Sequence, residues 1–209
     1  MSITEPARPV RTNDPEGTRR RLVDAAFEAF TTRGYHATSL HELKRVLGAS
    51  GGALSHHFPA KRDLGLAVLR ERVAPAVEET WIAPVLLAPT AAAGVQDAFA
   101  AIASQLEAQG RVDGCPLNNL ALELSQADEA FRMDIAAVFE GWTRAIADKL
   151  RDDQRGGRAP SVDADDLAAL VVAAYSGAMA MAKAAQDAQP LRRCARQLAQ
   201  LEGLRPAHL

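Results

Sequence analysis

The chain has 209 residues, of which 48% are hydrophobic and 24% charged, so it can form a core of ordinary size and is not globally disordered. Its two cysteines exclude the disulfide framework of a small secreted protein. The net charge of −2 is unevenly spread, because residues 1–72 carry twelve Lys and Arg against eight Asp and Glu, which suggests a polyanionic partner for the first third.

Residues 1–14 are predicted to form a flexible N-terminal arm with several prolines. The first helix begins at Asp14-Pro15, because Asp is a favoured N-cap and Pro suits the first helical position. Its apolar residues recur at helical spacing from Leu22 to Phe30, and Gly34 ends it.

A second helix is predicted from Ser39, where Ser39 and Glu42 fit a capping box, to Gly48. Ser50 can cap a short third helix over residues 51–57. A fourth helix runs from about Lys61 and is expected to kink or end near Pro75. We therefore assign residues 15–60 to one small domain and 61–209 to a larger one.

The larger domain is also predicted to be helical, so the fold class is all-α. Breakers separate predicted helices at about 94–109, 116–126, 129–152, 163–187 and 190–203. The segment at 163–187 is apolar around most of its circumference, which requires burial on two sides. We expect the second side to form a homodimer contact, with Ala178 in it and with residues 190–203 alongside.

Two short helices joined by Gly48-Ala49-Ser50 form a helix-turn-helix pattern, with a stabilising helix before it. The spacing of the following residues over about 20–68 resembles the tetracycline-repressor (TetR) family of bacterial transcription regulators: Ala25-Ala26-Phe27, Phe30, Arg33-Gly34-Tyr35, Thr38-Ser39-Leu40, Leu43, Leu47 to Ser50, Gly52 to Leu54, His57-Phe58-Pro59, Lys61 and Leu64. The resemblance implies an N-terminal three-helix DNA-binding domain and a C-terminal helical domain for ligand binding and dimerisation.

Helix N-termini attract phosphate, so the ends at Thr38, Ser39 and Ser50 are candidate contacts to a DNA backbone. Lys61 resembles the phosphate-contacting lysine of the family. Arg19, Arg20 and Arg21 either add backbone contacts or form a solvated face. The recognition helix departs from the family pattern at Gly51, Ser55 and Ala60, so base reading is expected from a set of small and imidazole side chains: His41, Gly51, Gly52, Ser55 and His56. His57 is either a packing or a phosphate-side residue.

Cys115 precedes Pro116 at a predicted helix start, in a stretch similar to one found in a branch of the family. The helix dipole there would lower the thiol pKa and make Cys115 a sensor of electrophiles, and a buried structural cysteine is the alternative. The candidate ligand residues are Cys115, Asn118, Leu122, Phe139, Trp142, Tyr175 and Met179. No cofactor and no metal site is predicted.

The sequence therefore predicts a homodimeric repressor that binds a palindromic double-stranded DNA operator and is released by a small-molecule or thiol-reactive effector. A DNA-binding dimer without a ligand, and more remotely an enzyme that uses Cys115, remain alternatives. The longest uncharged stretch, residues 167–182, is shorter than the ~20 residues that cross a bilayer, and no signal peptide is evident. We expect a cytoplasmic protein without a membrane partner.

Overall fold

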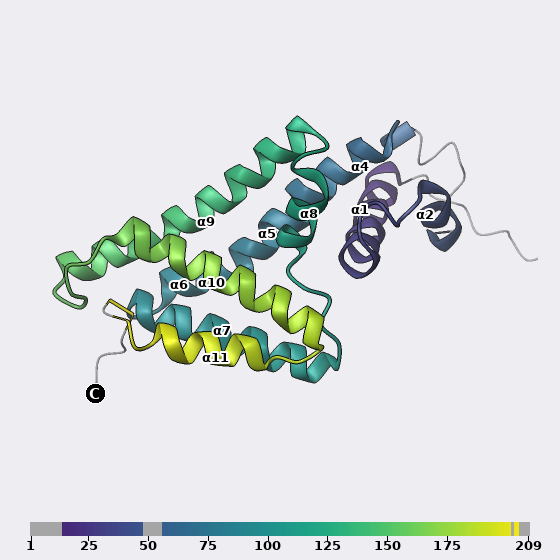
Figure 1. Cartoon of the computed structure of the whole chain (residues 1–209). Helices are drawn as coiled ribbons and strands as arrows, with labels where there is room; N and C mark the ends of the chain where they lie inside the picture. The colour runs from purple at the N-terminus through teal and green to yellow at the C-terminus, as the bar shows by residue number, and fades with distance from the viewer. Residues whose placement is uncertain (1–13, 48–55, 202, 205–209) are drawn as a thin grey trace, which may run out of the picture.

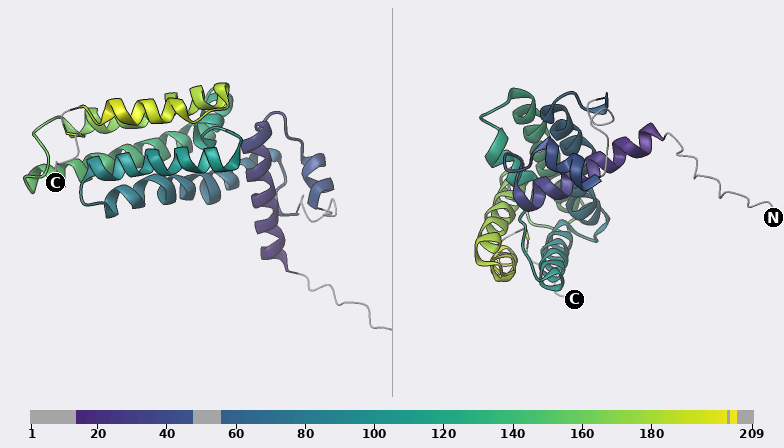
Figure 2. Two further views of the ribbon diagram at one scale, coloured as in Figure 1. Left: turned by 90° about the horizontal axis from the view of Figure 1, so that it is seen from below. Right: turned by 90° about the vertical axis from the view of Figure 1, so that its right-hand side faces the viewer.

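The computed structural model describes residues 14–47, 56–201 and 203–204, and every regular element among them is a helix. Helices α1 (Pro15–Arg33) and α2 (Leu40–Leu47) lie at one end of the molecule (Figure 1). The larger C-terminal part extends away from them as an elongated helical bundle (Figure 2). The all-α prediction is confirmed, whereas the predicted arm falls outside the described residues, as does nearly all of the short third helix.

The chain passes between the two parts along one continuous helical path. Helices α4 (Lys61–Val68), α5 (Ala74–Val77) and α6 (Ala83–Leu87) are joined by π-helical turns at Leu69–Val73 and Glu78–Ile82. Pro75 lacks the N–H that would bond to the carbonyl of Glu71 in an α-helix. The Arg72 Nη1 atom donates to that carbonyl instead, at 2.7 Å. The path therefore does not end near Pro75 but continues to Leu87, with the extra residues of the π turns absorbing the proline.

Four long helices make the body of the C-terminal part: α7 (Ala91–Gln109), α9 (Glu129–Arg155), α10 (Ala164–Ala185) and α11 (Gln189–Leu198). Helix α10 packs between α9 and α11, and α11 packs on α7. The short helix α8 (Pro116–Leu124) lies between this body and α1 (Figure 1). Helix α7 begins earlier than predicted because Thr90 caps it by accepting the Ala93 amide.

Aromatic rings fill the centre of the bundle. Trp81 lies 4.8 Å from Tyr175, 5.1 Å from Trp142 and 5.3 Å from Phe99, measured between ring centroids. Such pairs contribute about 0.5–1.5 kcal/mol each beyond the burial of their area. We call Trp81, Phe99, Trp142 and Tyr175 the aromatic cluster.

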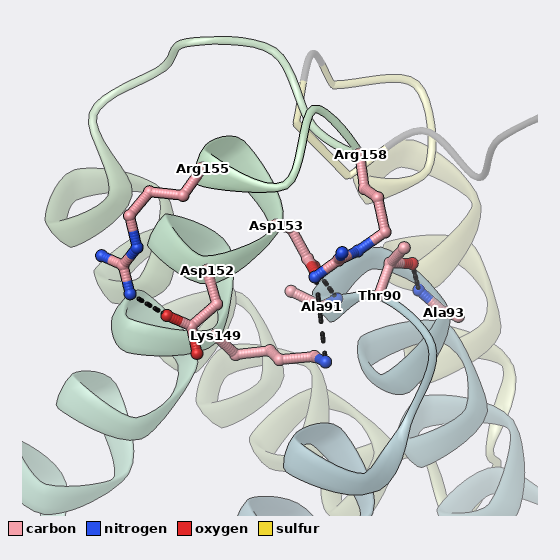
Figure 3. Close-up of polar contacts among 8 residues, drawn as sticks. All are labelled: Thr90, Ala91, Ala93, Lys149, Asp152, Asp153, Arg155 and Arg158. Atoms are coloured by element: carbon pink, nitrogen blue, oxygen red, sulfur yellow. Dashed lines mark hydrogen bonds and ion pairs between the residues drawn. The ribbon is translucent and has the colours of Figure 1, made fainter.

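A buried carboxylate fastens the end of the bundle far from α1 (Figure 3). Asp153 is 1% exposed and accepts the Ala91 amide, at the start of α7, at 2.6 Å. Its charge is balanced by Arg158 at 3.0 Å and by Lys149 at 3.9 Å. Because a buried charge is tolerated only when it is paired and hydrogen-bonded, this arrangement ties α9 to α7.

Helix α10 is long and apolar enough to span a membrane by length and composition alone. One of its faces belongs to the core of the bundle. The other face is exposed and carries mostly small or apolar side chains: Ala169, Leu170, Ala173, Gly177, Ala180 and Met181. Ala178 does not belong to that face, since it is 5% exposed and packs within its own subunit, so the expectation that Ala178 forms the dimer contact is wrong.

Candidate DNA-binding surface and effector cavity

The start of α2 has the capping box that the sequence predicts. The Ser39 amide donates to Glu42 Oε2 at 2.9 Å, and the Glu42 amide donates to Ser39 Oγ at 3.1 Å. These hydrogen bonds from Ser39 lower the pKa of the Glu42 carboxyl. His41 follows in the first turn with an exposed side chain. Ser39 and His41 thus lie on the solvent-facing end of α2.

Thr38 does not take the predicted outward position. It is fully buried, and its hydroxyl donates to the carbonyls of Gly34 at 2.9 Å and Ala29 at 3.3 Å. These two carbonyls lie in the last turns of α1 and at its C-cap. Thr38 therefore joins α1 to the turn before α2, and its hydroxyl is not available to a DNA backbone.

The ammonium group of Lys61, in the first turn of α4, lies above an aromatic ring. Its Nζ atom is 4.3 Å from the Tyr35 ring centroid and donates to the His36 carbonyl at 3.5 Å. Partial burial lowers the pKa of Lys61. Of the other predicted contacts, His56 is exposed and His57 is half-buried, while Ser50, Gly51, Gly52 and Ser55 lie outside the described residues.

The arginines of α1 have different surroundings. Arg19 forms an ion pair with Glu71 at 2.5 Å and lies over the Phe58 ring, at 5.4 Å from its centroid. Arg20 and Arg21 are exposed. Arg19 is therefore part of the packing between α1 and the long helical path, and of these three arginines only Arg20 and Arg21 face solvent.

A cavity of about 290 Å³ lies where α1, the long helical path, α7, α8, α9 and α10 meet. Its wall consists of Phe27, Thr31, Val73, Ala76, Val77, Thr80, Trp81, Ile102, Gln105, Leu106, Gln109, Asp113, Gly114, Cys115, Pro116, Leu117, Trp142, Tyr175 and Met179. Most of the wall is apolar, with a few amide, hydroxyl and carboxylate groups, which is the usual make-up of a small-molecule site.

Four of the predicted ligand residues line this cavity: Cys115, Trp142, Tyr175 and Met179. Three others do not. Leu122 is 86% exposed, the Asn118 amide donates to the Ser176 carbonyl at 3.2 Å, and Phe139 packs beside Trp142. The cavity wall begins at the N-terminal end of α8, and both Asn118 and Leu122 follow on a side of the helix turned away from it.

Sequence analysis missed the contribution of α1 to the cavity. Phe27 and Thr31 are one turn apart and lie beside, rather than on, the main apolar stripe of α1. The one signal in the sequence was Phe27, a large aromatic residue beside an apolar face of α1 that was already complete. Val73, Ala76, Val77 and Thr80 were missed because the fourth helix was expected to kink or end near Pro75, so its course around that residue was not predicted.

The pKa of the Cys115 thiol is shifted in the direction opposite to the expected one. Burial raises the pKa of its thiol, and the amides of Asn118 and Leu117 and the Tyr175 hydroxyl oppose this only in part. Burial likewise raises the pKa of Tyr175 well above its ordinary value. The predicted lowering of the Cys115 pKa by the helix dipole is therefore wrong, because loss of solvation outweighs the N-terminal amides.

Helix α8 connects the cavity to the turn between α1 and α2. Glu123 accepts the amides of Tyr35 at 3.0 Å and His36 at 2.9 Å. Asn119 donates to the Thr31 carbonyl at 3.5 Å and accepts from Lys183 of α10 at 3.2 Å. A displacement of α8 would therefore act on the backbone of the last turn of α1 and of the turn that precedes α2.

The sequence matches two family models. Residues 22–68 match "Bacterial regulatory proteins, tetR family". Residues 91–197 match "Transcriptional regulator LmrA/YxaF-like, C-terminal domain". The first range covers most of α1, all of α2 and the start of the long helical path, and the second covers α7 to most of α11.

Named relatives are similar to the chain over most of its length. The HTH-type transcriptional repressor DhaR of Mycobacterium sp. (strain GP1) is 26% identical over 83% of this chain and 86% of its own length. The HTH-type transcriptional regulator LmrA of Bacillus subtilis (strain 168) is 27% identical over 83% and 90%. A solved TetR transcriptional regulator from Chloroflexus aurantiacus superposes with a TM-score of 0.79 at 27% identity, over 90% of this chain and 95% of that one.

Proposed function

The chain belongs to the TetR family of bacterial transcriptional regulators, and we propose that it is an effector-responsive repressor that binds a palindromic operator as a homodimer. The name of one relative favours repression over activation, since DhaR is called a repressor. The geometry of α1 carries the rest of the proposal.

Helix α1 contacts both the DNA-binding elements and the cavity. On one side it packs against α2 and the start of α4. On the other side its residues Phe27 and Thr31 form part of the cavity wall. An occupant of the cavity therefore acts on a helix that sets the orientation of the DNA-binding elements, and this supports coupling between effector and operator.

The proposed DNA surface comprises the exposed start of α2 and the first turn of α4. Ser39, His41 and His56 offer hydrogen-bonding groups, and Lys61 offers a positive charge. The proposal also includes Ser50, Gly51, Gly52 and Ser55 as recognition residues, on the basis of the sequence pattern alone, since they lie outside the described residues. Thr38 is excluded from it because its hydroxyl is buried.

The exposed face of α10 is the proposed dimer contact. Leu170 is 47% and Met181 64% exposed there, between small residues that permit close approach of a second helix. On soluble proteins, a contiguous patch of exposed apolar side chains commonly marks a contact with another protein. A dimer that reads a palindrome needs its two recognition helices about 34 Å apart, one turn of DNA.

We propose a non-covalent effector, because burial raises the pKa of Cys115 and leaves little thiolate for direct attack. A gel-shift experiment with the DNA upstream of its own gene tests the function, with candidate small molecules and with N-ethylmaleimide. We expect binding by the untreated protein and release by a subset of neutral compounds, equally in wild type and in Cys115→Ser. Release by N-ethylmaleimide alone, lost in Cys115→Ser, would indicate thiol sensing, and release by no compound would indicate a ligand-independent regulator.

A further inference from the structure

The cavity has two chemically different ends. Its inner end is formed by Trp81, Trp142 and Tyr175 of the aromatic cluster together with Met179. Its outer end, beside α1, carries Thr31, Gln105, Gln109 and Asp113. A ligand that fills it must therefore match a ring-lined chamber at one end and the amide, hydroxyl and carboxylate groups of the outer end at the other.

The outer end leads to the surface between α1 and the loop before α8. An adjoining groove of about 490 Å³ is lined by Phe27, Glu28, Thr31, Thr32, Gln109, Arg111 and Asp113. It shares Phe27, Thr31, Gln109 and Asp113 with the cavity. These shared residues, which we call the entrance, lie where the cavity meets the groove, so a molecule that uses this groove passes along α1.

The one charged side chain of the cavity wall is paired. Asp113 is the one residue with a formal charge among those that line the cavity in the described part of the chain, and it forms an ion pair with Arg111 at 2.8 Å. A charged ligand would lose its hydration without gaining a free counter-charge, which is costly. In contrast, the Thr31 hydroxyl has no hydrogen-bond partner among the described residues and can bond to an uncharged polar group.

We propose that the effector is an uncharged molecule with a flat apolar body and one polar end, and that Thr31 and Phe27 of α1 are part of its binding site. The body lies against Trp81 and Trp142, and the polar end hydrogen-bonds to Thr31 beside Gln109. This rests on the proposed function, because it takes the cavity as the effector site. The effector then contacts the DNA-binding domain directly, in addition to acting through α8.

Equilibrium dialysis of the full-length protein without DNA tests this with four two-ring probes, which suit a cavity of about 300 Å³. The probes are 2-naphthol, naphthalene, the 2-naphthoate anion and the 2-naphthylmethylammonium cation. We expect 2-naphthol to bind at least tenfold more tightly than either ion and about threefold to tenfold more tightly than naphthalene, the value of one hydrogen bond. Thr31→Val should abolish the advantage over naphthalene, whereas Thr32→Val, one residue outside the cavity wall, should retain it.

Each contrary result overturns a stated part of the proposal. Equal or tighter binding of an ion, or no binding of any probe, overturns the uncharged class. An advantage of 2-naphthol that survives in Thr31→Val overturns the role of α1. The indole N–H groups of Trp81 and Trp142 have no partner in the described part of the chain. If Trp142→Phe abolishes the advantage of 2-naphthol over naphthalene and Thr31→Val does not, the polar end of the ligand lies at the aromatic cluster. Operator binding, measured without any probe, is unaffected by these outcomes and tests the proposed function separately.

Discussion

The carboxylate of Glu123 on α8 accepts the backbone amide of Tyr35 at 3.0 Å. The same carboxylate accepts the next amide along the chain, that of His36, at 2.9 Å. One side chain of the C-terminal part thus holds two consecutive peptide groups of the turn before α2. This contact explains how a change around the cavity can reach the DNA-binding elements without unfolding either part.

Glu123→Gln should weaken this contact. A glutamine offers one carbonyl oxygen, and its NH₂ group would face the second amide, so at least one hydrogen bond to a charged acceptor is lost. We expect the free energy of unfolding to fall by about 1–3 kcal/mol in urea denaturation. Glu129→Gln is the control, since Glu129 has a 78% exposed side chain. Equal stabilities of the two variants would contradict a special role of Glu123.

Gly34→Ala should be more damaging than another glycine substitution. Gly34 has φ 95° and ψ 156°, a region that is open almost only to glycine, and an added Cβ would lie 2.9 Å from Glu123 Oε1. Gly110 has φ 65° in the left-handed helical region, with nothing within 4 Å of an added Cβ. We expect Gly34→Ala to lower the melting temperature markedly more than Gly110→Ala. A similar loss in both would show that the turn is not held as described.

The ion pair between Arg19 and Glu71 should make stability depend on pH. The hydrogen bond from Arg19 lowers the pKa of Glu71 below its usual value of 4.5. A lowered folded-state pKa contributes stability above pH 4.5 and loses it as the pH falls through the folded-state value. Chemical denaturation between about pH 5 and pH 3 should therefore show a steeper loss for wild type than for Glu71→Gln. Parallel curves would argue against this contribution.

Ala173→Arg should disrupt the proposed dimer. Ala173 lies at the middle of the exposed α10 face, where a long charged side chain would meet the second copy. Light scattering should give a dimer for wild type and a monomer for the variant, with folding unchanged by circular dichroism. Ala136→Arg, at an exposed position of α9, is the matched control and should remain dimeric. A dimeric Ala173→Arg protein would place the contact elsewhere.

Lys61→Gln should reduce binding to specific and unrelated DNA alike. Its ammonium group is positioned by Tyr35 in the first turn of α4, and removing one phosphate contact should reduce the slope of log affinity against log salt by about 1 per site. His41→Ala should instead relax base preference at one position of each half-site. Fluorescence anisotropy at several salt concentrations separates these effects, and an unchanged slope in Lys61→Gln would remove Lys61 from the DNA contact.

Local signals predicted the starts of the first two helices well, whereas the cavity depends on packing. The Ser39 and Glu42 capping box is encoded within four residues and was predicted in detail. Leu122 has the expected apolar spacing for the inner side of α8, yet it is exposed because α8 packs against α9 and α1 on other sides. Spacing alone specifies a helix face but not what that face contacts.

The pKa of Cys115 and the exposed face of α10 could not be predicted from local sequence, because both depend on which segments pack around them. The helix N-terminus beside Cys115 is visible in the sequence, but the burial that reverses its effect on the thiol pKa arises from distant segments. For α10, the apolar pattern identifies a helix that is apolar on two sides, but which of these sides packs inside the subunit, with Ala178 on it, depends on how α9 and α11 pack.

Selection of DNA by the full-length protein from a pool of random duplexes tests the central claim most directly. A homodimeric repressor predicts enrichment of an inverted repeat whose half-site centres are one helical turn, about 34 Å, apart. It also predicts binding at least about a thousandfold tighter than to a scrambled duplex of equal composition. Recovery of no preferred sequence, or of a single half-site without symmetry, would contradict it.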